Sequence, residues 1–169
     1  MGRELVVDEA SFRELDSFGL PERHYSYIAA GKARVVPSLE PIFREHADEI
    51  DQVVIAHELP VDVWEEYRHV FDADPRFEFT RSEGHNLGLL PGGVTKGSGL
   101  AELCRRLDIP LSETAAFGNA DNDAEMCAAA GFGVAVGHES ELLYAAAQYH
   151  APANDEDGVA WFLENELGI

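Results

Sequence analysis

The most informative segment of this 169-residue chain is Gly118-Asn119-Ala120-Asp121-Asn122-Asp123-Ala124-Glu125-Met126. It follows the short apolar run Ala115-Ala116-Phe117, which we interpret as a buried strand. The residues from Asp121 to Ala130 have the pattern of a helix that Gly131 ends. In an open parallel sheet, ligands gather beyond the carboxyl ends of the strands, and this stretch lies at that position.

A lysine on the other side of the same strand forms the second part of the pattern. Lys96 lies in Gly93-Val94-Thr95-Lys96-Gly97, within the first turn of a helix predicted over Thr95–Leu107. A cation at this end opposes the helix dipole, and a phosphate between Lys96 and the helix end would remove that conflict. A solvated surface lysine and ordinary capping by Asp and Asn are the alternatives for each motif taken alone. Two motifs on either side of one strand favour a shared site.

The polar residues after the strand have the chemistry of a cation site. Mg²⁺ prefers hard oxygen ligands, usually one or two carboxylates together with waters and a substrate phosphate. Asn119, Asp121, Asn122 and Asp123 supply such oxygens at the start of a helix, where free backbone N–H groups favour an anion. We therefore expect a site for a phosphate and a divalent cation.

Composition excludes several classes of protein. The net charge of −20 argues against a basic surface for nucleic acid, and the 46% hydrophobic content argues against a disordered chain. No apolar run approaches the ~20 residues that span a bilayer, and the N-terminal segment turns acidic at once, unlike a signal peptide. We expect a cytoplasmic protein that binds neither nucleic acid nor a membrane. Cys104 and Cys127 lack metal-ligand spacing and are predicted to be reduced thiols packed against helices.

Strands and helices alternate in the C-terminal part, which predicts a parallel sheet with crossover helices. The expected strands are Ala115–Phe117, Phe132–Val136 and Gln148–Ala151. The expected helices are Thr95–Leu107, Asp121–Ala130, Glu139–Ala147 and Asp157–Leu167. The predicted apolar face of the first of these helices consists of Leu100, Leu103, Cys104 and Leu107.

The N-terminal part is predicted to be an α+β unit with an antiparallel hairpin. The hairpin joins the strands Arg76–Arg81 and His85–Leu90 through a turn at Glu83-Gly84. The boundary between the two parts is expected near Pro91-Gly92-Gly93. The remaining expected elements are helices at Ser11–Phe18, Leu39–His46 and Val61–Val70, and extended segments at Lys32–Val36 and Asp51–Ala56.

Four ordered motifs resemble the C-terminal half of the haloacid dehalogenase-like superfamily, in its Cof-type phosphatase branch. They are Gly93–Gly97, Gly118–Met126, Ala130–Val136 and Asn154–Val159. The resemblance implies an α/β fold, in which residues 91–169 form the C-terminal half of a Rossmann-like parallel-sheet core. It also implies that residues 1–90 form an α+β cap-like domain.

The resemblance also assigns roles to the polar residues. It implies that Lys96 is a catalytic and phosphate-binding residue that stabilises the charge of the transferring phosphoryl group, with Asn122 as a further phosphate ligand. It implies a Mg²⁺ cofactor bound by residues at the positions of Asn119 and Asp123, with Asp121 as a ligand that could compensate for Asn119. The family has an Asp where this chain has Asn119, so we expect weaker metal binding.

The family's nucleophile motif, a strand ending in Asp-x-Asp-Gly, does not appear ahead of the cap-like domain. Asp72-Ala73-Asp74 follows a predicted helix and is interpreted as a helix-terminating turn. The chain therefore resembles the family without the N-terminal part of its core. In the family the nucleophile strand lies beside the strand corresponding to Ala115–Phe117, so we expect this strand to have an exposed apolar edge, which gives either a homodimer or a monomer prone to association.

These features together predict a Mg²⁺-dependent phosphatase that acts on small phosphorylated metabolites, such as sugar phosphates. We expect little or no turnover from the chain alone, because charge stabilisation does not replace a nucleophile. The alternative is a non-catalytic remnant that binds a phosphorylated ligand, or a protein partner through the exposed strand edge.

Overall fold

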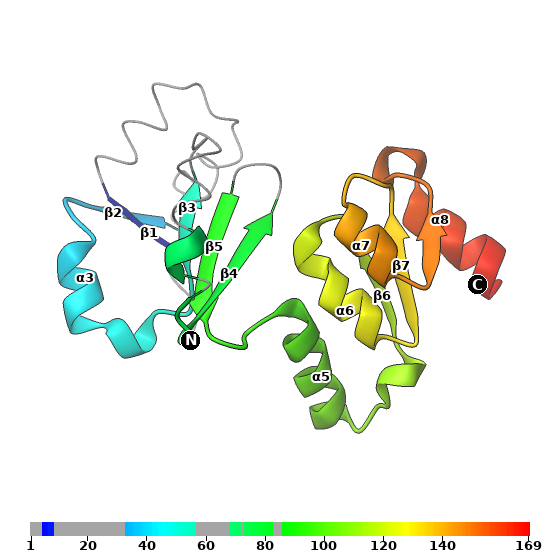
Figure 1. Ribbon diagram of the computed structural model, residues 1–169, viewed down its shortest axis with the longest axis horizontal. Helices are drawn as coiled ribbons and strands as arrows, with labels where there is room; N and C mark the ends of the chain where they lie inside the picture. Colours follow the sequence, from blue (N-terminus) through cyan, green and yellow to red (C-terminus); the bar gives the residue numbers. More distant parts are fainter. Residues whose placement is uncertain (1–4, 9–32, 57–67, 72, 83–85) are drawn as a thin grey trace. The chain divides into compact units, whose positions relative to one another are not determined.

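The computed structural model describes residues 5–8, 33–56, 68–71, 73–82 and 86–169 (Figure 1). The chain divides into two compact units, Met1–Asp51 and Gln52–Ile169. The domain boundary predicted near Pro91 lies within the second unit and stays a prediction. The elements predicted at Ser11–Phe18, at Glu83-Gly84 and over most of Val61–Val70 lie outside the described residues.

The first unit contains a parallel pair of strands and a short helix. Strand β1 (Leu5–Asp8) pairs with β2 (Ala33–Val36), which confirms the predicted extended segment for its described residues 33–36. Strand β1 is not among the elements predicted from the sequence. Helix α3 (Glu40–Glu45) is followed by the 3₁₀ turn η1 (Ala47–Glu49), in agreement with the predicted helix.

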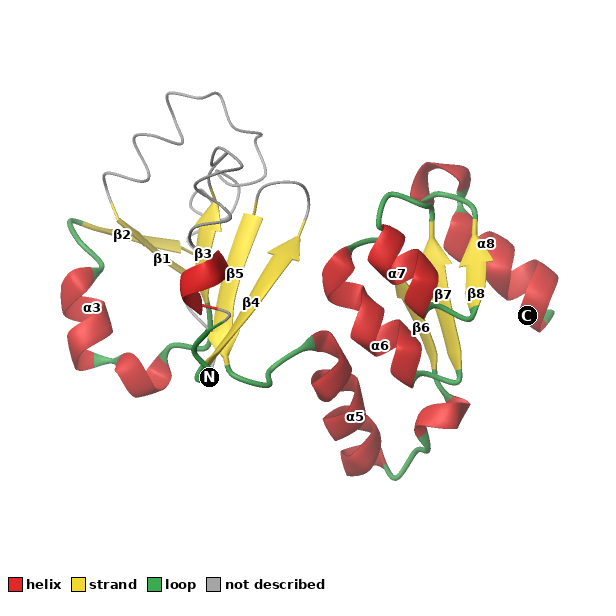
Figure 2. Ribbon diagram, in the orientation of Figure 1, coloured by secondary structure: helices red, strands yellow, loops and turns green. Residues whose placement is uncertain are grey.

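The second unit begins with an antiparallel sheet in which β5 lies between β3 and β4 (Figure 2). These strands are β3 (Val53–Ala56), β4 (Phe77–Ser82) and β5 (Asn86–Pro91), which confirms the predicted antiparallel pairing. Residues 68–71 form a helical turn, and the ring of Phe71 contacts the rings of Phe77 and Phe79 at centroid distances of 5.7 and 6.1 Å. Phe77 and Phe79 therefore lie on one face of β4, as the alternating pattern predicts.

Asp74 lies in the turn that the sequence predicts for it. Its Oδ1 atom accepts hydrogen bonds from the backbone N–H and the Nε of Arg76, at 3.0 and 2.9 Å. The side-chain hydrogen bond from Arg76 lowers the pKa of Asp74 to about 2. A carboxylate engaged in this way stabilises the turn, and this supports the interpretation of Asp74 as a turn residue.

The C-terminal part of the second unit has the predicted α/β architecture. Three parallel strands lie in the order β6 (Ala115–Gly118), β7 (Phe132–Val136) and β8 (Tyr149–Ala151). The helices are α5 (Lys96–Leu107), α6 (Ala124–Ala129), α7 (Glu141–Ala146) and α8 (Gly158–Phe162), the last continuing as the π-helical segment η5 (Leu163–Leu167). The predicted helix from Asp121 starts with a 3₁₀ turn, η3 (Asp121–Asp123), before α6 begins.

Alternating side chains of the parallel sheet build two core layers. On one face, Ala116 and Ala135 pack with Cys127 of α6 and Leu143 of α7. On the other face, Phe162 of α8 packs with Val134 and Ala151 of the sheet. The partly buried residues Phe117, Phe132 and Leu167 complete this layer. Burial on both faces is typical of a parallel sheet.

Both cysteines are free and buried, as predicted. The thiol of Cys127 lies 3.7 Å from the carbonyl oxygens of Ala116 and Val134, between α6 and the sheet. Burial raises the pKa of the Cys127 thiol, and the nearby Asp123 carboxylate raises it further. The thiol therefore stays protonated and acts as a small core side chain.

The predicted apolar face of α5 is partly wrong. Cys104 is buried and Leu100 packs against the core, but Leu103 and Leu107 are 53% and 58% exposed. The helix packs against α6, and its buried stripe includes Gly97, Leu100 and Cys104, which recur at helical spacing. Leu103 and Leu107 lie outside that stripe. No helix in the described part of the chain is long and apolar enough to cross a membrane.

A glycine on β7 allows α6 to approach the sheet closely. A methyl group built on Gly133 would overlap the backbone carbonyl of Cys127, whereas a methyl group on Gly99, in α5, would meet nothing within 4 Å. We expect Gly133→Ala to lower the free energy of unfolding by about 2–3 kcal/mol, because two backbone segments must separate. Gly99→Ala is the control and should raise it by about 0.5–1 kcal/mol, since alanine is the better helix former. Urea unfolding measures the free energy of unfolding of both variants. Equal values for Gly133→Ala and the wild type would contradict this packing.

Candidate functional site

A capping box fixes Lys96 at the start of α5. The Ser98 backbone N–H donates to Thr95 Oγ1 at 3.0 Å, and the Thr95 backbone N–H donates to Ser98 Oγ at 2.9 Å. These two bonds satisfy donors that a helix N-terminus leaves free. Lys96 therefore occupies the first helical position on a well-defined turn.

The carboxylate of Asp123 organises the turn between β6 and α6. Its Oδ2 atom accepts hydrogen bonds from the backbone N–H groups of Asn119 at 3.0 Å and Ala120 at 3.2 Å. The side chain is 5% exposed and lies against Gly118, where any β-carbon would overlap the Asp123 side chain. Glycine at this position therefore leaves space for the carboxylate.

Lys96 and the polar turn meet in space. The Lys96 Nζ donates a hydrogen bond to Asp123 Oδ1 and lies 3.4 Å from Asn122 Oδ1. The lysine side chain is 49% exposed, so its ammonium group is accessible on the side away from Asp123. The structure thus brings together three residues of the predicted site, Lys96, Asn122 and Asp123, from two helix starts.

Asp121 and Asn119 lie elsewhere on the same turn. Asp121 Oδ1 accepts a hydrogen bond from Ser140 Oγ at 2.5 Å, and Ser140 is 7% exposed. Ser140 also caps α7, because its Oγ accepts the backbone N–H of Leu143 at 3.0 Å. Asn119 is exposed. Sequence reasoning missed Ser140: a serine before Glu141 signals a helix cap, but no local signal shows that it contacts Asp121.

The oxygen atoms around the turn could serve as some of the ligands of a Mg²⁺ ion. The amide of Asn119 and the carboxylate of Asp121 are exposed oxygen donors, while both oxygens of Asp123 already accept hydrogen bonds. Among the residues that the structure describes, no group of three or more His, Cys, Asp or Glu side chains could hold a metal ion. The oxygen chemistry suits a hard cation, but waters and a phosphate would have to fill most coordination positions.

A cavity of about 540 Å³ in the second unit opens beside Lys96. Lys96, Asp121 and Asn122 line one part of it, and Arg68, Glu78 and Thr80 are also among its lining residues. The volume lies in the range of small-molecule sites, and the lining offers charges of both signs.

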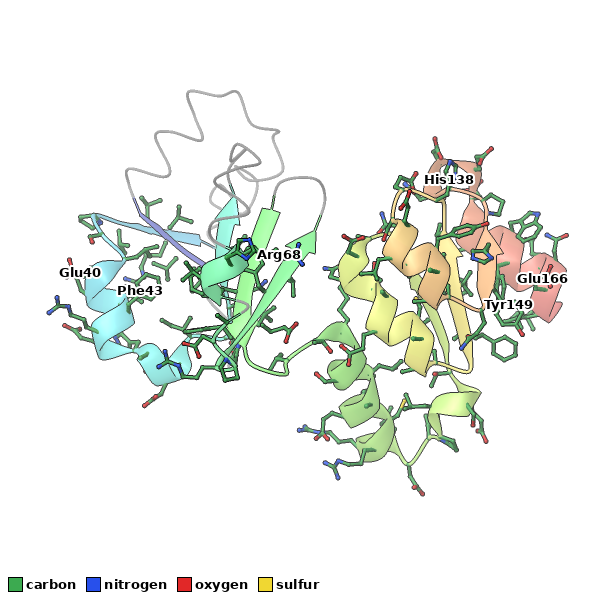
Figure 3. The ribbon with its side chains drawn as sticks, in the orientation of Figure 1. Glu40, Phe43, Arg68, His138, Tyr149 and Glu166 are labelled. Carbon is green, nitrogen blue, oxygen red and sulfur yellow. The ribbon has the colours of Figure 1, made fainter. Side chains whose placement is uncertain are left out.

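His138 lies in the loop that follows β7 (Figure 3). Because β6 and β7 are parallel, this loop leaves the sheet at the same end as the η3 turn. The side chain of His138 is exposed.

The letters Asp-x-Asp-Gly also occur at residues 155–158, a repeat of the nucleophile pattern that the sequence predictions did not weigh. These residues form the 3₁₀ turn η4 (Asn154–Glu156) and the start of α8, and no strand ends directly at them. Asp157 has a φ of +55°, and its carbonyl accepts the backbone N–H of Trp161. The segment is therefore a helix start and lacks the strand-end position of a phosphatase nucleophile.

The model of the haloacid dehalogenase-like hydrolase family matches residues 19–163. The chain belongs to this family. The relatives place it in the Cof-type branch, as the four sequence motifs predict. Phosphatase YwpJ of Bacillus subtilis is 38% identical over 104 residues, which cover 62% of this chain and 35% of YwpJ.

Solved structures of family members share the fold. A haloacid dehalogenase-like hydrolase from B. subtilis superposes with a TM-score of 0.68 at 29% identity, covering 79% of this chain and 47% of that one. A subclass IIB sugar phosphatase gives a TM-score of 0.66 at 29% identity, covering 81% and 49%. The predicted α/β class is confirmed, and the chain spans about half the length of these proteins or less.

The Lys96–Asp123 ion pair should contribute measurably to stability. We expect Asp123→Ala to lower the free energy of unfolding by about 2–4 kcal/mol, since it removes the acceptor of two backbone N–H groups as well as the ion pair. Lys96→Met should cost only about 1 kcal/mol, because half of the lysine is in solvent, which screens its charge. Urea unfolding of both single variants and the double variant measures the coupling.

The double variant should lose less than the sum of the single losses, because both substitutions remove the same hydrogen bond. Glu164→Ala is the surface control and should change stability by no more than about 0.5 kcal/mol. Strictly additive losses would show that Lys96 and Asp123 do not interact in solution.

Proposed function

We propose that this chain carries the phosphate- and cation-binding part of a Mg²⁺-dependent phosphomonoester hydrolase acting on small phosphorylated metabolites, such as sugar phosphates. The observation that carries the proposal is the meeting of Lys96 Nζ with Asn122 and Asp123 at the carboxyl end of β6. The names of the relatives support it, since they include a phosphatase and a sugar phosphatase.

Each residue has a defined task in this proposal. The ammonium group of Lys96 would neutralise charge on the phosphoryl oxygens, and Asp123 would keep that group in place. The Asn122 amide oxygen lies near Lys96, which leaves its NH₂ group as a donor for a phosphate oxygen.

The cation would be bound by oxygen ligands of the same turn. Asn119 would contribute a carbonyl oxygen, with Asp121 and Asp123 as the nearby carboxylates. When bound, Mg²⁺ neutralises charge on the phosphoryl group and orients it. An amide at position 119 carries no charge, so the affinity should be lower than that of a site with a carboxylate there.

Turnover needs a nucleophile in addition to this charge stabilisation. A phosphatase of this kind transfers the phosphoryl group to an Asp and then hydrolyses the product. No residue of the site described above is placed to do this. The proposed role of the chain by itself is therefore binding, with little or no hydrolysis.

Phosphate binding tests the proposed function. We expect inorganic phosphate to bind the wild-type chain in the presence of Mg²⁺ and Lys96→Ala to weaken binding at least ~10-fold, because a charged contact is lost. Arg105→Ala removes an exposed cation on the same helix and should leave the affinity unchanged. Calorimetry measures the dissociation constant of phosphate for the wild type and for each variant. A colorimetric assay with an aryl phosphate measures turnover.

Two results would count against the proposal. Equal phosphate affinity of Lys96→Ala and the wild type would remove Lys96 from the site. Rapid hydrolysis of the aryl phosphate that depends on Lys96 would mean that the chain contains a nucleophile outside the proposed set.

A second candidate function is a non-catalytic protein that binds a phosphorylated ligand or a partner. The observation that favours it is the edge of β6, which pairs with β7 on one side and with no other strand among the described residues. Unpaired N–H and C=O groups on an edge strand pair readily with another chain. We infer that a second copy of the chain binds there.

Homodimer formation tests this inference. We expect the wild-type chain to be dimeric and Ala115→Lys to be monomeric, because Ala115 is exposed on β6 and a lysine opposes strand pairing. Ala145→Lys places the same change on the exposed surface of α7 and should leave the dimer intact. Light scattering after size-exclusion chromatography gives the mass. A wild-type monomer at high concentration would refute the dimer.

A further inference from the structure

The turn that carries Asn122 and Asp123 is linked to Ser140, the residue before α7, by a part-buried hydrogen bond. Ser140 Oγ donates to Asp121 Oδ1 at 2.5 Å while it accepts the backbone N–H of Leu143 at 3.0 Å. Ser140 is 7% exposed, so water has little access to compete for its hydroxyl group. The link connects residues that are 19 positions apart in the sequence.

Apart from the Asp121–Ser140 bond, the hydrogen bonds of the turn centre on Asp123. The turn is a 3₁₀ turn of three residues, and its internal bonds run from Asp123 N–H to the Ala120 carbonyl and from Ala120 N–H to Asp123 Oδ2. A 3₁₀ turn has weaker hydrogen-bond geometry than an α-helix. A fixed point on a neighbouring helix therefore restricts the positions that the turn can take.

We propose that Asp121 is a positioning residue, which acts through Ser140 to keep the η3 turn in the geometry where Asn122 and Asp123 meet Lys96. Asp121 immediately precedes Asn122, so a shift of its backbone moves the Asn122 amide directly. The position of the turn also determines where Asp123 Oδ1, the acceptor for Lys96, lies. The relevance of this geometry to phosphate rests on the proposed function, but the positioning itself does not.

This role differs from that of a metal ligand in a way that substitutions can separate. A metal ligand has no effect when no metal is present, so amide exchange measured without Mg²⁺ reports the turn itself. The hydrogen bond from Ser140 needs only an acceptor oxygen, which Asn retains and Ala lacks. A difference between Asp121→Asn and Asp121→Ala therefore reports the hydrogen bond.

Amide hydrogen exchange in the full chain provides the main test. We expect Asp121→Ala to raise the exchange rates of the Asn119 and Ala120 amides by ~10-fold or more, because both donate to Asp123 within the turn. Asp121→Asn should stay within about twofold of the wild type. The amide of Val134, in the buried central strand, reports global opening and should not change.

Ser140→Ala supplies the reciprocal test. It should accelerate exchange at Asn119 and Ala120 as Asp121→Ala does, and it should also accelerate exchange at Leu143, which loses its cap. Asp121→Ala should leave Leu143 protected, because Ser140 still accepts its N–H. In the presence of Mg²⁺, inorganic phosphate should bind Asp121→Ala several-fold more weakly than Asp121→Asn, which keeps both an acceptor for Ser140 and an oxygen ligand for the cation.

Three results would overturn the proposal. The first is unchanged exchange at Asn119 and Ala120 in Asp121→Ala, and the second is an equal increase in Asp121→Asn and Asp121→Ala. The third is an equal increase at Val134, which would make the role one of global stability. If the wild-type chain does not bind phosphate, the proposed function fails while the exchange rates still decide the positioning role.

Discussion

The site depends on the hydrogen bonds that the buried carboxylate of Asp123 accepts. A charged group that is 5% exposed is costly unless hydrogen bonds replace the lost water. Here two backbone N–H groups and the Lys96 ammonium group supply those bonds. Each donor comes from a different position in the chain, so the carboxylate joins the end of β6 to the start of α5. The loss of this one side chain would therefore affect both elements.

Small residues around Asp123 make this arrangement possible. Gly118 leaves space for the carboxylate, and Gly133 allows α6 to approach β7. Ala116, Ala124 and Ala135 complete a thin core layer between the sheet and its helices. Close packing of small side chains leaves little room to adjust, because interiors are packed as densely as organic crystals. The position of the polar turn thus follows from the volumes of the residues beneath it.

Local sequence patterns predicted most of the C-terminal fold, but they failed where contacts join residues that are far apart in the sequence. β7 was predicted from Phe132 to Val136, because an apolar run between glycines leaves few alternatives. Periodicity alone could not show which side of α5 is buried, so Leu103 and Leu107 were wrongly placed in the core. The meeting of Lys96 with the polar turn was predictable from two motifs flanking one strand. The Ser140–Asp121 bond was not, since it depends on how α7 packs beside the turn.

The charges of the site explain why a cation belongs in the proposed reaction. The charge of Lys96 is offset by Asp123, with which it forms an ion pair, and Asp121 adds a further negative charge on the same turn. A phosphate monoester, itself an anion, would meet little net positive charge there. The whole chain, at −20, would also repel it at long range. A bound divalent cation would change the sign of the local field, so phosphate affinity and cation affinity at this turn must be coupled, each ligand strengthening the other.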